Sequence, residues 1–200
     1  MISDMFTVCA IAIFCMVSVG HSAPLACEDA VRPLVQLDPH HLEGTWALVA
    51  ASLSDPVLLE FFKCRNSSSV NFSNASATSD IVYTPSVNAG GKCHFQSYNV
   101  SLEGSILTFD EQHQVNLTGI FLYTSCPDCL VMRFDNQLKK VMRLHLVSRR
   151  REVEPKEMEE FRAQVECLNM PAPVVMDPSK ELCPEQSQNI IQPNQLMSAL

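Results

Sequence analysis

The stretch that decides the fold is HLEGTWALVAAS, which spans residues 41–52 and contains the only tryptophan of the chain, Trp46. Trp46 follows Gly44 by two residues and opens a short apolar run. A glycine followed by a large aromatic residue, and then by small or β-branched residues, indicates a strand that enters a sheet where another group packs closely against the backbone. An ordinary core strand with an ordinary core tryptophan would give the same pattern, so the surrounding elements have to decide.

The length of the chain, 200 residues, is sufficient for one domain with a sizeable core, and no repeat or linker divides it. Residues 6–20, FTVCAIAIFCMVSVG, form an apolar run of 15 residues, which is too short to span a bilayer comfortably. The small and polar residues that follow are a plausible cleavage region. The sequence therefore predicts a signal peptide over residues 1–22, one domain over 23–185 and a flexible tail over 186–200. An uncleaved signal that acts as a membrane anchor is the alternative.

The charge of the chain is acidic. Its formal net charge is −8, and removal of residues 1–22 would leave −7, from 14 basic and 21 acidic residues. An acidic surface without a basic stripe argues against nucleic acid and anionic lipid as partners.

Glycosylation signals and cysteines point to the secretory route. The five N-glycosylation sequons begin at Asn66, Asn71, Asn74, Asn99 and Asn116. Seven cysteines lie after the predicted cleavage site, and in an oxidising compartment most of them form disulfides. Because seven is an odd number, one thiol is left without a partner in the chain. We therefore expect a secreted, extracellular glycoprotein with a disulfide framework.

From residue 45 onward the apolar pattern is mainly of period two, which predicts strands. The predicted strands are Thr45–Leu53, Ser69–Ser76, Ile81–Thr84, Lys92–Leu102, Ile106–Phe109, Val115–Tyr123, Leu130–Phe134 and Val141–Val147. One interruption, at Ser54–Arg65, has a Ser/Asp cap, a proline and helical spacing, and predicts a short helical lid over a ligand cavity or over the core. Sequential short strands with tight turns describe an up-and-down meander, and eight of them close into a barrel wide enough for one small ligand.

One amphipathic helix follows the last strand. Pro155 occupies a first-turn position, and the apolar stripe behind it consists of Met158, Phe161, Val165 and Leu168. This stripe should pack on the outside of the sheet. The predicted fold class is all-β with one helix: an eight-stranded, up-and-down antiparallel β-barrel followed by a C-terminal α-helix.

These features together resemble the lipocalin family. Gly44-Thr45-Trp46 matches the first signature of the family, and Arg149 matches the basic residue that the family packs across that tryptophan. The second family motif, Thr-Asp-Tyr, is absent. Residues 121–127, FLYTSCP, resemble instead an outlying group that comprises apolipoprotein M, alpha-1-acid glycoprotein and the tributyltin- and saxitoxin/tetrodotoxin-binding glycoproteins. The resemblance covers the chain from about Cys27 to Cys183.

The resemblance also implies two disulfides, Cys27 with Cys167 and Cys93 with Cys183. The third bridge of apolipoprotein M cannot form, because Glu157 stands at one of its two positions. Cys64, Cys126 and Cys129 remain for one bridge and one odd thiol. Either Cys126 pairs with Cys129, or Cys64 pairs with one of them.

The resemblance implies a carrier that binds and transports a small hydrophobic or amphipathic ligand in the barrel. The candidate ligand-binding residues are Tyr98 (or Phe95 in its place), Phe109, Phe121, Tyr123, Met132, Arg143 and His145. Arg143 matches one of the arginines with which apolipoprotein M binds a sphingolipid phosphate, but glutamines stand where two others would lie. Because one arginine in place of three forms fewer charge-assisted hydrogen bonds, the sequence argues against a phospholipid-like ligand. A sphingolipid carrier on lipoprotein particles is the first alternative.

No motif for catalysis, a cofactor or a metal appears, so we do not expect an enzyme. Cys126-Pro127-Asp128-Cys129 has the spacing of a redox motif, but its place at a predicted hairpin favours a structural bridge. His40-His41 lacks a third metal ligand. The remaining enzyme hypothesis is a thiol-dependent isomerase with Cys64 as its nucleophile, which requires that the thiol reach the cavity.

Overall fold

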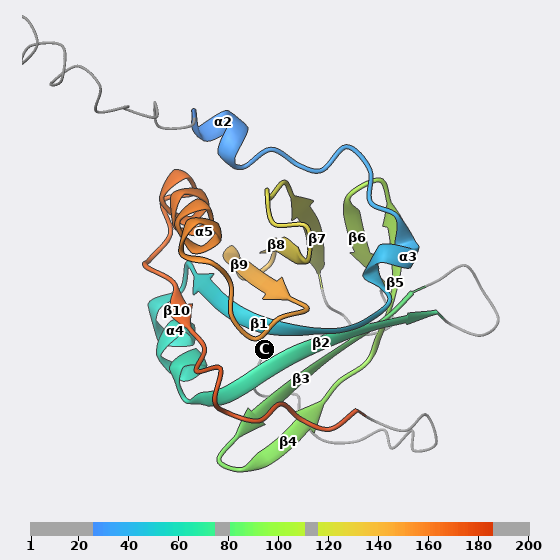
Figure 1. The fold of residues 1–200 in the computed structure, drawn as a ribbon. Helices are drawn as coiled ribbons and strands as arrows, with labels where there is room; N and C mark the ends of the chain where they lie inside the picture. The colour runs from blue at the N-terminus through green and yellow to red at the C-terminus, as the bar shows by residue number, and fades with distance from the viewer. Residues whose placement is uncertain (1–25, 75–80, 111–115, 186–200) are drawn as a thin grey trace, which may run out of the picture.

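A closed antiparallel barrel forms the body of the computed structural model, which describes residues 26–74, 81–110 and 116–185 (Figure 1). Its eight strands are β1 (Gly44–Leu53), β2 (Arg65–Asn74), β3 (Ile81–Ala89), β5 (Tyr98–Glu103), β6 (Ile106–Phe109), β7 (Leu117–Leu122), β8 (Cys129–Asn136) and β9 (Val141–Ser148). Each strand pairs with the next, and β9 pairs with β1 to close the barrel. The predicted fold class is therefore confirmed. The predicted signal peptide and tail lie outside the described residues.

Two short strands flank the barrel. β4 (Lys92–Phe95) pairs with β3, and β10 (Val174–Val175) pairs with β1. The sequence predicted one strand over Lys92–Leu102, whereas the structure interrupts it at Gln96-Ser97. The interruption lies opposite Pro85 of β3, which has no N–H to donate to the ladder, although Gln96 still donates to its carbonyl. Period-two alternation continues through this point, so the pattern alone does not show it.

The barrel interior is filled with aromatic side chains. Phe72, Tyr83, Tyr98, Phe109 and Phe134 are all buried and belong to one apolar cluster. Their rings lie in contact: the centroids of Phe72 and Tyr83 are 5.3 Å apart, and those of Tyr98 and Phe109 are 5.5 Å apart. Tilted and edge-on pairs of this kind stabilise the core beyond the burial of their area.

A second apolar cluster lies between the barrel and α5 (Pro155–Cys167), which covers one outer side of the sheet (Figure 1). The helix begins with a capping box between Glu154 and Glu157. Phe161 and Val165 are buried against Leu144 and Leu146 of β9, as the apolar stripe predicted.

The end of the barrel at which β1 begins is closed by α3 (Pro39–Leu42) and by the segment that follows α2 (Cys27–Ala30), in which Leu34 and Leu37 donate their backbone N–H groups to the carbonyls of Phe121 and Gly104. Trp46 is fully buried and donates a hydrogen bond from Nε1 to the carbonyl of Leu42 at 2.8 Å. Arg149 lies over the Trp46 ring, with its Cζ 3.7 Å from the ring centroid, and donates to three backbone carbonyls nearby. The Gly44-Thr45-Trp46 motif, together with Arg149, therefore closes this end of the barrel.

The chain after α5 runs along the outside of β1, β2 and β3 (Figure 1). Met176 donates its backbone N–H to the carbonyl of Val49, and the Ser67 hydroxyl donates to the carbonyl of Glu181. A disulfide between Cys183 and Cys93 then fixes the segment to β4. We call residues 170–185 the C-terminal strap.

Candidate functional site

The opposite end of the barrel carries a helical lid, α4 (Pro56–Lys63), between β1 and β2. Asp55 caps the helix, because its side chain accepts hydrogen bonds from the backbone N–H groups of the first turn. Leu59 and Phe62 are buried, whereas Phe61 is 70% exposed. The predicted short helix over Ser54–Arg65 is confirmed. We call this end of the barrel the barrel mouth.

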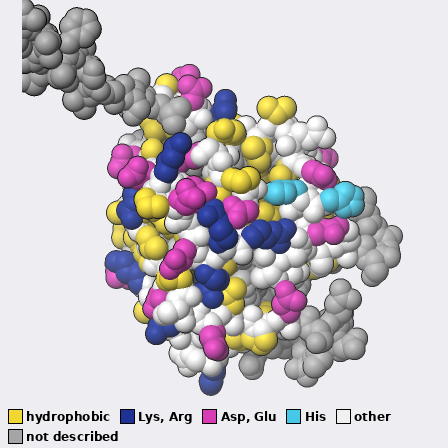
Figure 2. Space-filling view, viewed as in Figure 1, with side chains coloured by type: hydrophobic (Ala, Val, Ile, Leu, Met, Phe, Trp, Pro, Cys, Tyr) yellow, Lys and Arg dark blue, Asp and Glu magenta, His cyan; other side chains and the backbone are white. Residues whose placement is uncertain are grey.

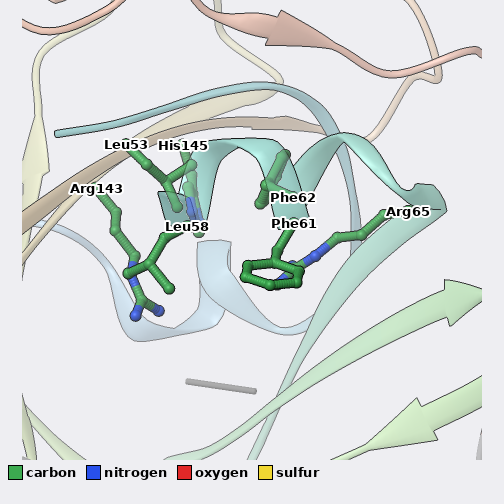
Figure 3. A pocket seen from close by; sticks show the side chains of 7 residues that line it. All are labelled: Leu53, Leu58, Phe61, Phe62, Arg65, Arg143 and His145. Atoms are coloured by element: carbon green, nitrogen blue, oxygen red, sulfur yellow. The ribbon is translucent and has the colours of Figure 1, made fainter. Parts of the chain in front are cut away.

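A small cavity lies beneath α4 at the barrel mouth (Figure 3). It is lined by Leu53, Leu58, Phe61, Phe62, Arg65, Arg143 and His145, and its volume is about 50 Å³. Small-molecule sites are usually several hundred Å³, so this cavity has room for a head group and not for a long apolar chain.

Two arginines approach the cavity from different strands. Register pairs Leu53 of β1 with Arg143 of β9, and Arg65 opens β2 directly after the lid. Figure 3 shows the two side chains on opposite sides of the cavity, with Phe61 in front of the guanidinium of Arg65. The Arg65 guanidinium also lies over the Phe62 ring, 4.4 Å from its centroid. Two cations therefore converge on one partly apolar space.

The cavity gives these cations no carboxylate. None of the seven lining residues is acidic, and Nε of Arg143 is buried without a hydrogen-bond partner among the described residues. Burial and the neighbouring charge of Arg143 lower the pKa of Arg65 to about 10, and burial lowers the pKa of Arg143. Desolvation is the largest cause of both lowered pKa values, because burial disfavours a charged guanidinium, and for Arg65 the charge of Arg143 adds to it. The site is therefore electropositive and short of an anion.

His145 lies beside Arg143 in this interior and is neutral. Its ring packs 5.4 Å from the ring of Phe134 and 6.2 Å from that of Phe62, centroid to centroid. Burial, followed by the charges of Arg143 and Arg65, lowers the pKa of His145 to about 3. Nε2 of His145 has no hydrogen-bond partner among the described residues. His145 therefore offers a polar atom to the cavity without adding a charge.

Two tyrosines lie further inside the barrel. Burial raises the pKa of Tyr83, and burial raises that of Tyr98 to about 12, so both phenols stay protonated at physiological pH. Arg143 interacts electrostatically with both groups and opposes the shift in each. The phenols are protonated groups next to the cationic cavity, so they do not neutralise it.

The predicted ligand-binding residues do not all lie together in the structure. Tyr98, Phe109, Phe121 and Met132 are buried in the apolar cluster of the barrel interior. Arg143 and His145 line the cavity at the mouth. Phe95 is half-buried on β4.

The structure contradicts the predicted position of Tyr123. The sequence placed it on the interior face with Phe121, but β7 ends at Leu122, and Tyr123 is 38% exposed on the outside. There the guanidinium of Arg32 lies over its ring, 4.1 Å from the centroid. The backbone explains the change of direction: Tyr123 donates its N–H to the carbonyl of Arg32 and accepts a hydrogen bond from Gln164 of α5. Tyr123 therefore lines an outer groove next to α5 and not the barrel.

Arg65 is the residue that the sequence analysis missed. The sequence pattern places Arg65 at the end of the predicted helix, and only the register of β2 shows that it begins a barrel strand. The sequence predicts one arginine at the site, which disfavours a phosphate head group, whereas the structure brings two arginines together there.

The structure contains the two disulfides that the resemblance implies, and it decides how Cys64, Cys126 and Cys129 are paired. Cys27 is bonded to Cys167 and Cys93 to Cys183. The third disulfide joins Cys126 to Cys129, which leaves Cys64 as an exposed free thiol among the described residues. Cys64 does not line the cavity; its Sγ lies 3.7 Å from the backbone carbonyl of Glu60 in α4. The position thus lacks the access to the cavity that the isomerase hypothesis requires.

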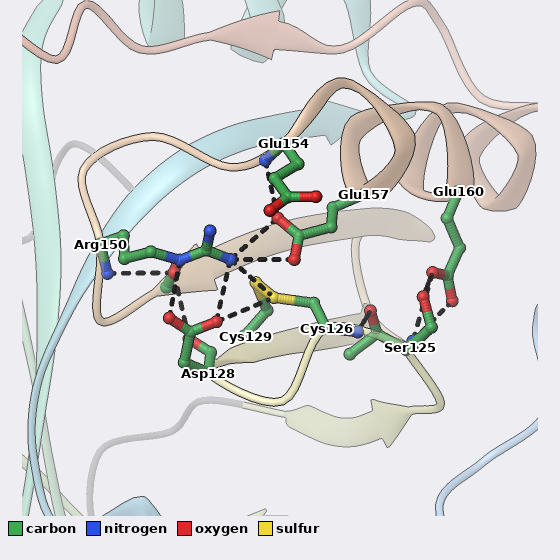
Figure 4. The surroundings of a disulfide bond; sticks show 10 residues. Ser125, Cys126, Asp128, Cys129, Arg150, Glu154, Glu157 and Glu160 are labelled. Carbon is green, nitrogen blue, oxygen red and sulfur yellow. Dashed lines mark hydrogen bonds and ion pairs between the residues drawn. A yellow bond between two sulfur atoms is a disulfide. The ribbon is translucent and has the colours of Figure 1, made fainter.

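The residues around the Cys126–Cys129 disulfide give it a structural role (Figure 4). The Arg150 guanidinium bridges Asp128 and Glu157, with Nε 2.6 Å from an Asp128 carboxylate oxygen and Nη2 2.8 Å from a Glu157 carboxylate oxygen. The sulfurs of Cys126 and Cys129 and the carboxylates of Asp128 and Glu157 lie as close together as the ligands of a metal ion. The two sulfurs are bonded to each other, however, and the two carboxylates are paired with the Arg150 guanidinium, so these groups are already engaged. This cluster clamps the β7–β8 turn to the start of α5.

Comparison with known proteins gives one family match and many structural matches. The family model of the ApoM domain matches residues 35–187. A search of curated protein sequences finds no match. Among solved structures, lipocalin 12 from rat epididymis aligns with a TM-score of 0.64 at 15% identity, covering 80% of this chain and 95% of that one. The siderocalin Ex-FABP aligns with a TM-score of 0.58 at 17% identity, covering 74% and 97%. These likenesses establish the lipocalin fold, which supports the binding of small hydrophobic ligands.

Proposed function

We propose that this chain, which belongs to the ApoM domain family, binds a small amphipathic molecule at the barrel mouth and transports it outside the cell. In this proposal Arg65 and Arg143 hold the anionic head group, and the apolar part of the ligand enters the barrel. The chain acts as a binding protein and not as an enzyme.

The observation that carries this proposal is the pair of half-buried arginines at the cavity, for which the described lining residues provide no carboxylate. A charge removed from water is costly unless it gains a partner, and here the two positive charges also repel each other. A ligand anion between the two guanidinium groups would supply the missing partner. Charge-assisted hydrogen bonds to arginine are stronger than neutral ones, and the planar guanidinium suits a carboxylate or a phosphate.

The apolar part of the ligand needs more room than the cavity offers. Phe62 is 2% exposed and separates the mouth from the aromatic interior, so a chain can enter only if Phe62 moves. Phe62 belongs to α4, a helix of eight residues between two strands. We therefore assign the opening movement to α4, as the movable element over an otherwise closed barrel.

Either a carboxylate or a phosphate would satisfy this site. The sphingolipid carrier on lipoprotein particles thus remains the alternative, because the second arginine weakens the argument against a phosphate. The siderocalin Ex-FABP is described as a protein with dual ligand specificities, which fits a fold that accepts more than one ligand chemistry.

The test compares ligands that share a chain and differ in the head group: sodium oleate, oleoyl lysophosphatidate and methyl oleate, titrated calorimetrically into the purified protein. We expect at least one of the two anions to bind more tightly than the neutral ester. Because a charge-assisted hydrogen bond contributes about 1.5–3 kcal/mol, Arg65→Gln and Arg143→Gln should each weaken binding of that anion by about 10- to 100-fold. Neither substitution should weaken binding of the ester.

Arg133→Gln is the matched control, because Arg133 lies on β8, is paired with Asp135 and does not line the cavity. It should leave all three affinities unchanged. Equal binding of the anions and the ester would refute recognition of an anionic head group. The relative affinity for oleate and lysophosphatidate separates the two head-group chemistries.

We also infer secretion and N-glycosylation. The three disulfides support an oxidising compartment. Among the sequon asparagines, Asn66, Asn74, Asn99 and Asn116 are exposed, whereas Asn71 is half-buried and donates its amide hydrogen to Thr45 Oγ1. Expression in secretory cells should give protein in the medium whose mass falls on treatment with peptide-N-glycosidase. Protein retained in the cells without glycans would contradict the inference.

A further inference from the structure

A second cavity lies on the outside of the barrel, away from the mouth. It is the outer groove that Tyr123 lines, and its volume is about 300 Å³, at the lower end of the range for small-molecule sites. Leu34, in the segment that closes the barrel, donates to the carbonyl of Phe121 at the end of β7, which places the groove at the closed end. Its lining residues are Asp29, Ala30, Arg32, Tyr123, Glu160 and Ala163, none of which lines the cavity at the mouth.

The walls of the outer groove are fixed in place. The Cys27–Cys167 disulfide joins α2 to the end of α5, and Figure 1 shows α2 above that helix. Gln164 Nε2 donates to the carbonyl of Ala30 at 2.9 Å and to that of Tyr123 at 2.7 Å. A groove held by a disulfide and by buried hydrogen bonds keeps its shape without a ligand, so a ligand spends little free energy on ordering its walls.

The groove contains a carboxylate that only neutral groups satisfy. Glu160 of α5 is half-buried and accepts hydrogen bonds from the backbone N–H of Ser125, at 2.9 Å, and from the Ser125 hydroxyl (Figure 4). Asp29 of α2 is the second carboxylate of the lining. Neither carboxylate forms an ion pair among the described residues. Because a carboxylate oxygen accepts more than one hydrogen bond, both groups can still bind a cationic donor.

The one cation of the lining, Arg32, does not neutralise these carboxylates. Its guanidinium lies over the Tyr123 ring, 4.1 Å from the centroid, and forms no ion pair with a described carboxylate. Two carboxylates and one guanidinium leave the lining with an excess of negative charge. Residues 23–25, which precede α2 and lie outside the described part of the chain, are Ala, Pro and Leu and add no charged side chain.

Charges of both signs surround the groove. Figure 2 shows acidic, basic and hydrophobic side chains mixed over the region where Figure 1 shows α2 and α5. The exposed charged residues of these two helices that do not line the groove are Glu28, Glu159 and Glu166 on one side of the balance and Lys156 and Arg162 on the other. Selection of a cation therefore depends on the lining residues themselves and not on a field over the whole surface.

We propose that the outer groove is a second binding site, which takes a small organic cation with an apolar body, such as an aromatic amine. The ammonium group pairs with Glu160 and Asp29. The apolar body lies against Tyr123, Ala30 and Ala163, where the two alanines leave room because their side chains are single methyl groups. The site does not depend on the proposed head-group recognition, because the two cavities share no residue.

The test compares three ligands that share an indole ring and a two-carbon spacer: tryptamine, 3-ethylindole and indole-3-propionate. At neutral pH they are a cation, a neutral molecule and an anion. Each is titrated calorimetrically into the purified protein. We expect tryptamine to bind most tightly and indole-3-propionate most weakly. Equal binding of the three, tightest binding of the anion, or no binding of tryptamine would overturn the proposal.

Glu160→Gln removes the charge and keeps an oxygen that accepts from Ser125. It should weaken binding of tryptamine by about tenfold and leave binding of 3-ethylindole nearly unchanged. Its control is Glu159→Gln, which makes the same charge change at the preceding, exposed residue of α5, outside the lining. It should leave both affinities unchanged. An equal loss in the two variants would mean that the surface field and not the groove attracts the amine, and the proposal would be wrong.

Ala163→Leu fills the groove and should weaken binding of both tryptamine and 3-ethylindole. Ala172→Leu is its control, the same substitution at an exposed alanine that does not line the groove. Arg65→Gln, at the mouth, should leave binding of tryptamine unchanged. If Ala163→Leu binds both ligands normally, the indole occupies the barrel and the outer groove is not its site. Thermal unfolding of each variant shows whether it is folded.

Discussion

At the scale of single residues, the Gly-x-Trp motif is explained by Arg149. Gly44 has a φ of +92°, and a Cβ built on it would lie 3.1 Å from Nη1 of Arg149. The absence of a side chain lets the guanidinium reach the Trp46 ring and the carbonyls of Thr45 and Glu43. The sequence indicated that something packs closely against this glycine, and the resemblance identified the arginine.

Gly44→Ala should therefore destabilise the protein through both the backbone and the arginine. A positive φ costs an alanine about 1–2 kcal/mol, and displacement of Arg149 adds to that cost. Gly90→Ala is the matched control, because Gly90 has a φ of +58° and nothing within 4 Å of the added Cβ. Urea unfolding should show a larger loss of unfolding free energy for Gly44→Ala than for Gly90→Ala. Equal losses would mean that the close approach of Arg149 contributes nothing.

At the scale of elements, the period of the apolar pattern predicts most of the barrel because one face of each strand is buried. The strand Ile106–Phe109 and the helix after Pro155 appear where the pattern places them. The same pattern also predicts the lid, whose capping Asp55 and Pro56 are local signals. Such elements are determined by residues that are neighbours in the sequence.

The failures have causes that lie far away in the sequence. The break between β4 and β5 is set by Pro85 on the neighbouring strand, and Tyr123 turns outward because it pairs with Arg32. Arg65 and Arg143 reach the same cavity only because of the register of β2 and β9, two strands that are not adjacent in the chain. The apolar part of the site could be predicted as a set of core aromatics, but its charged centre required the three-dimensional structure.

At the scale of the whole molecule, the two ends of the described chain are tied to its body. The Cys27–Cys167 disulfide joins α2 to the end of α5, and the Cys93–Cys183 disulfide fixes the C-terminal strap. Bridges that close loops this long restrict the unfolded chain, which stabilises the fold by several kcal/mol in the entropic account. The barrel can therefore keep buried charges and a buried imidazole at its mouth without loss of the fold.

That buried imidazole makes the stability of the whole barrel depend on pH. The pKa of His145 is lowered in the folded state, from 6.5 to about 3, so below pH 6.5 the unfolded chain binds a proton that the folded protein excludes. The stabilisation is fully present above pH 6.5 and is lost as the pH falls from 6.5 towards 3.

His145→Phe removes this proton-binding site while it keeps a ring against Phe62 and Phe134. We expect urea unfolding to show that the variant loses about 1–3 kcal/mol less than the natural protein between pH 7 and pH 4.5, according to the linkage relation. The control is His40→Gln, at an exposed histidine, which should lose as much as the natural protein. If the two variants have the same acid sensitivity, His145 is either protonated in the folded barrel or open to water, and the neutral interior described for the mouth is wrong.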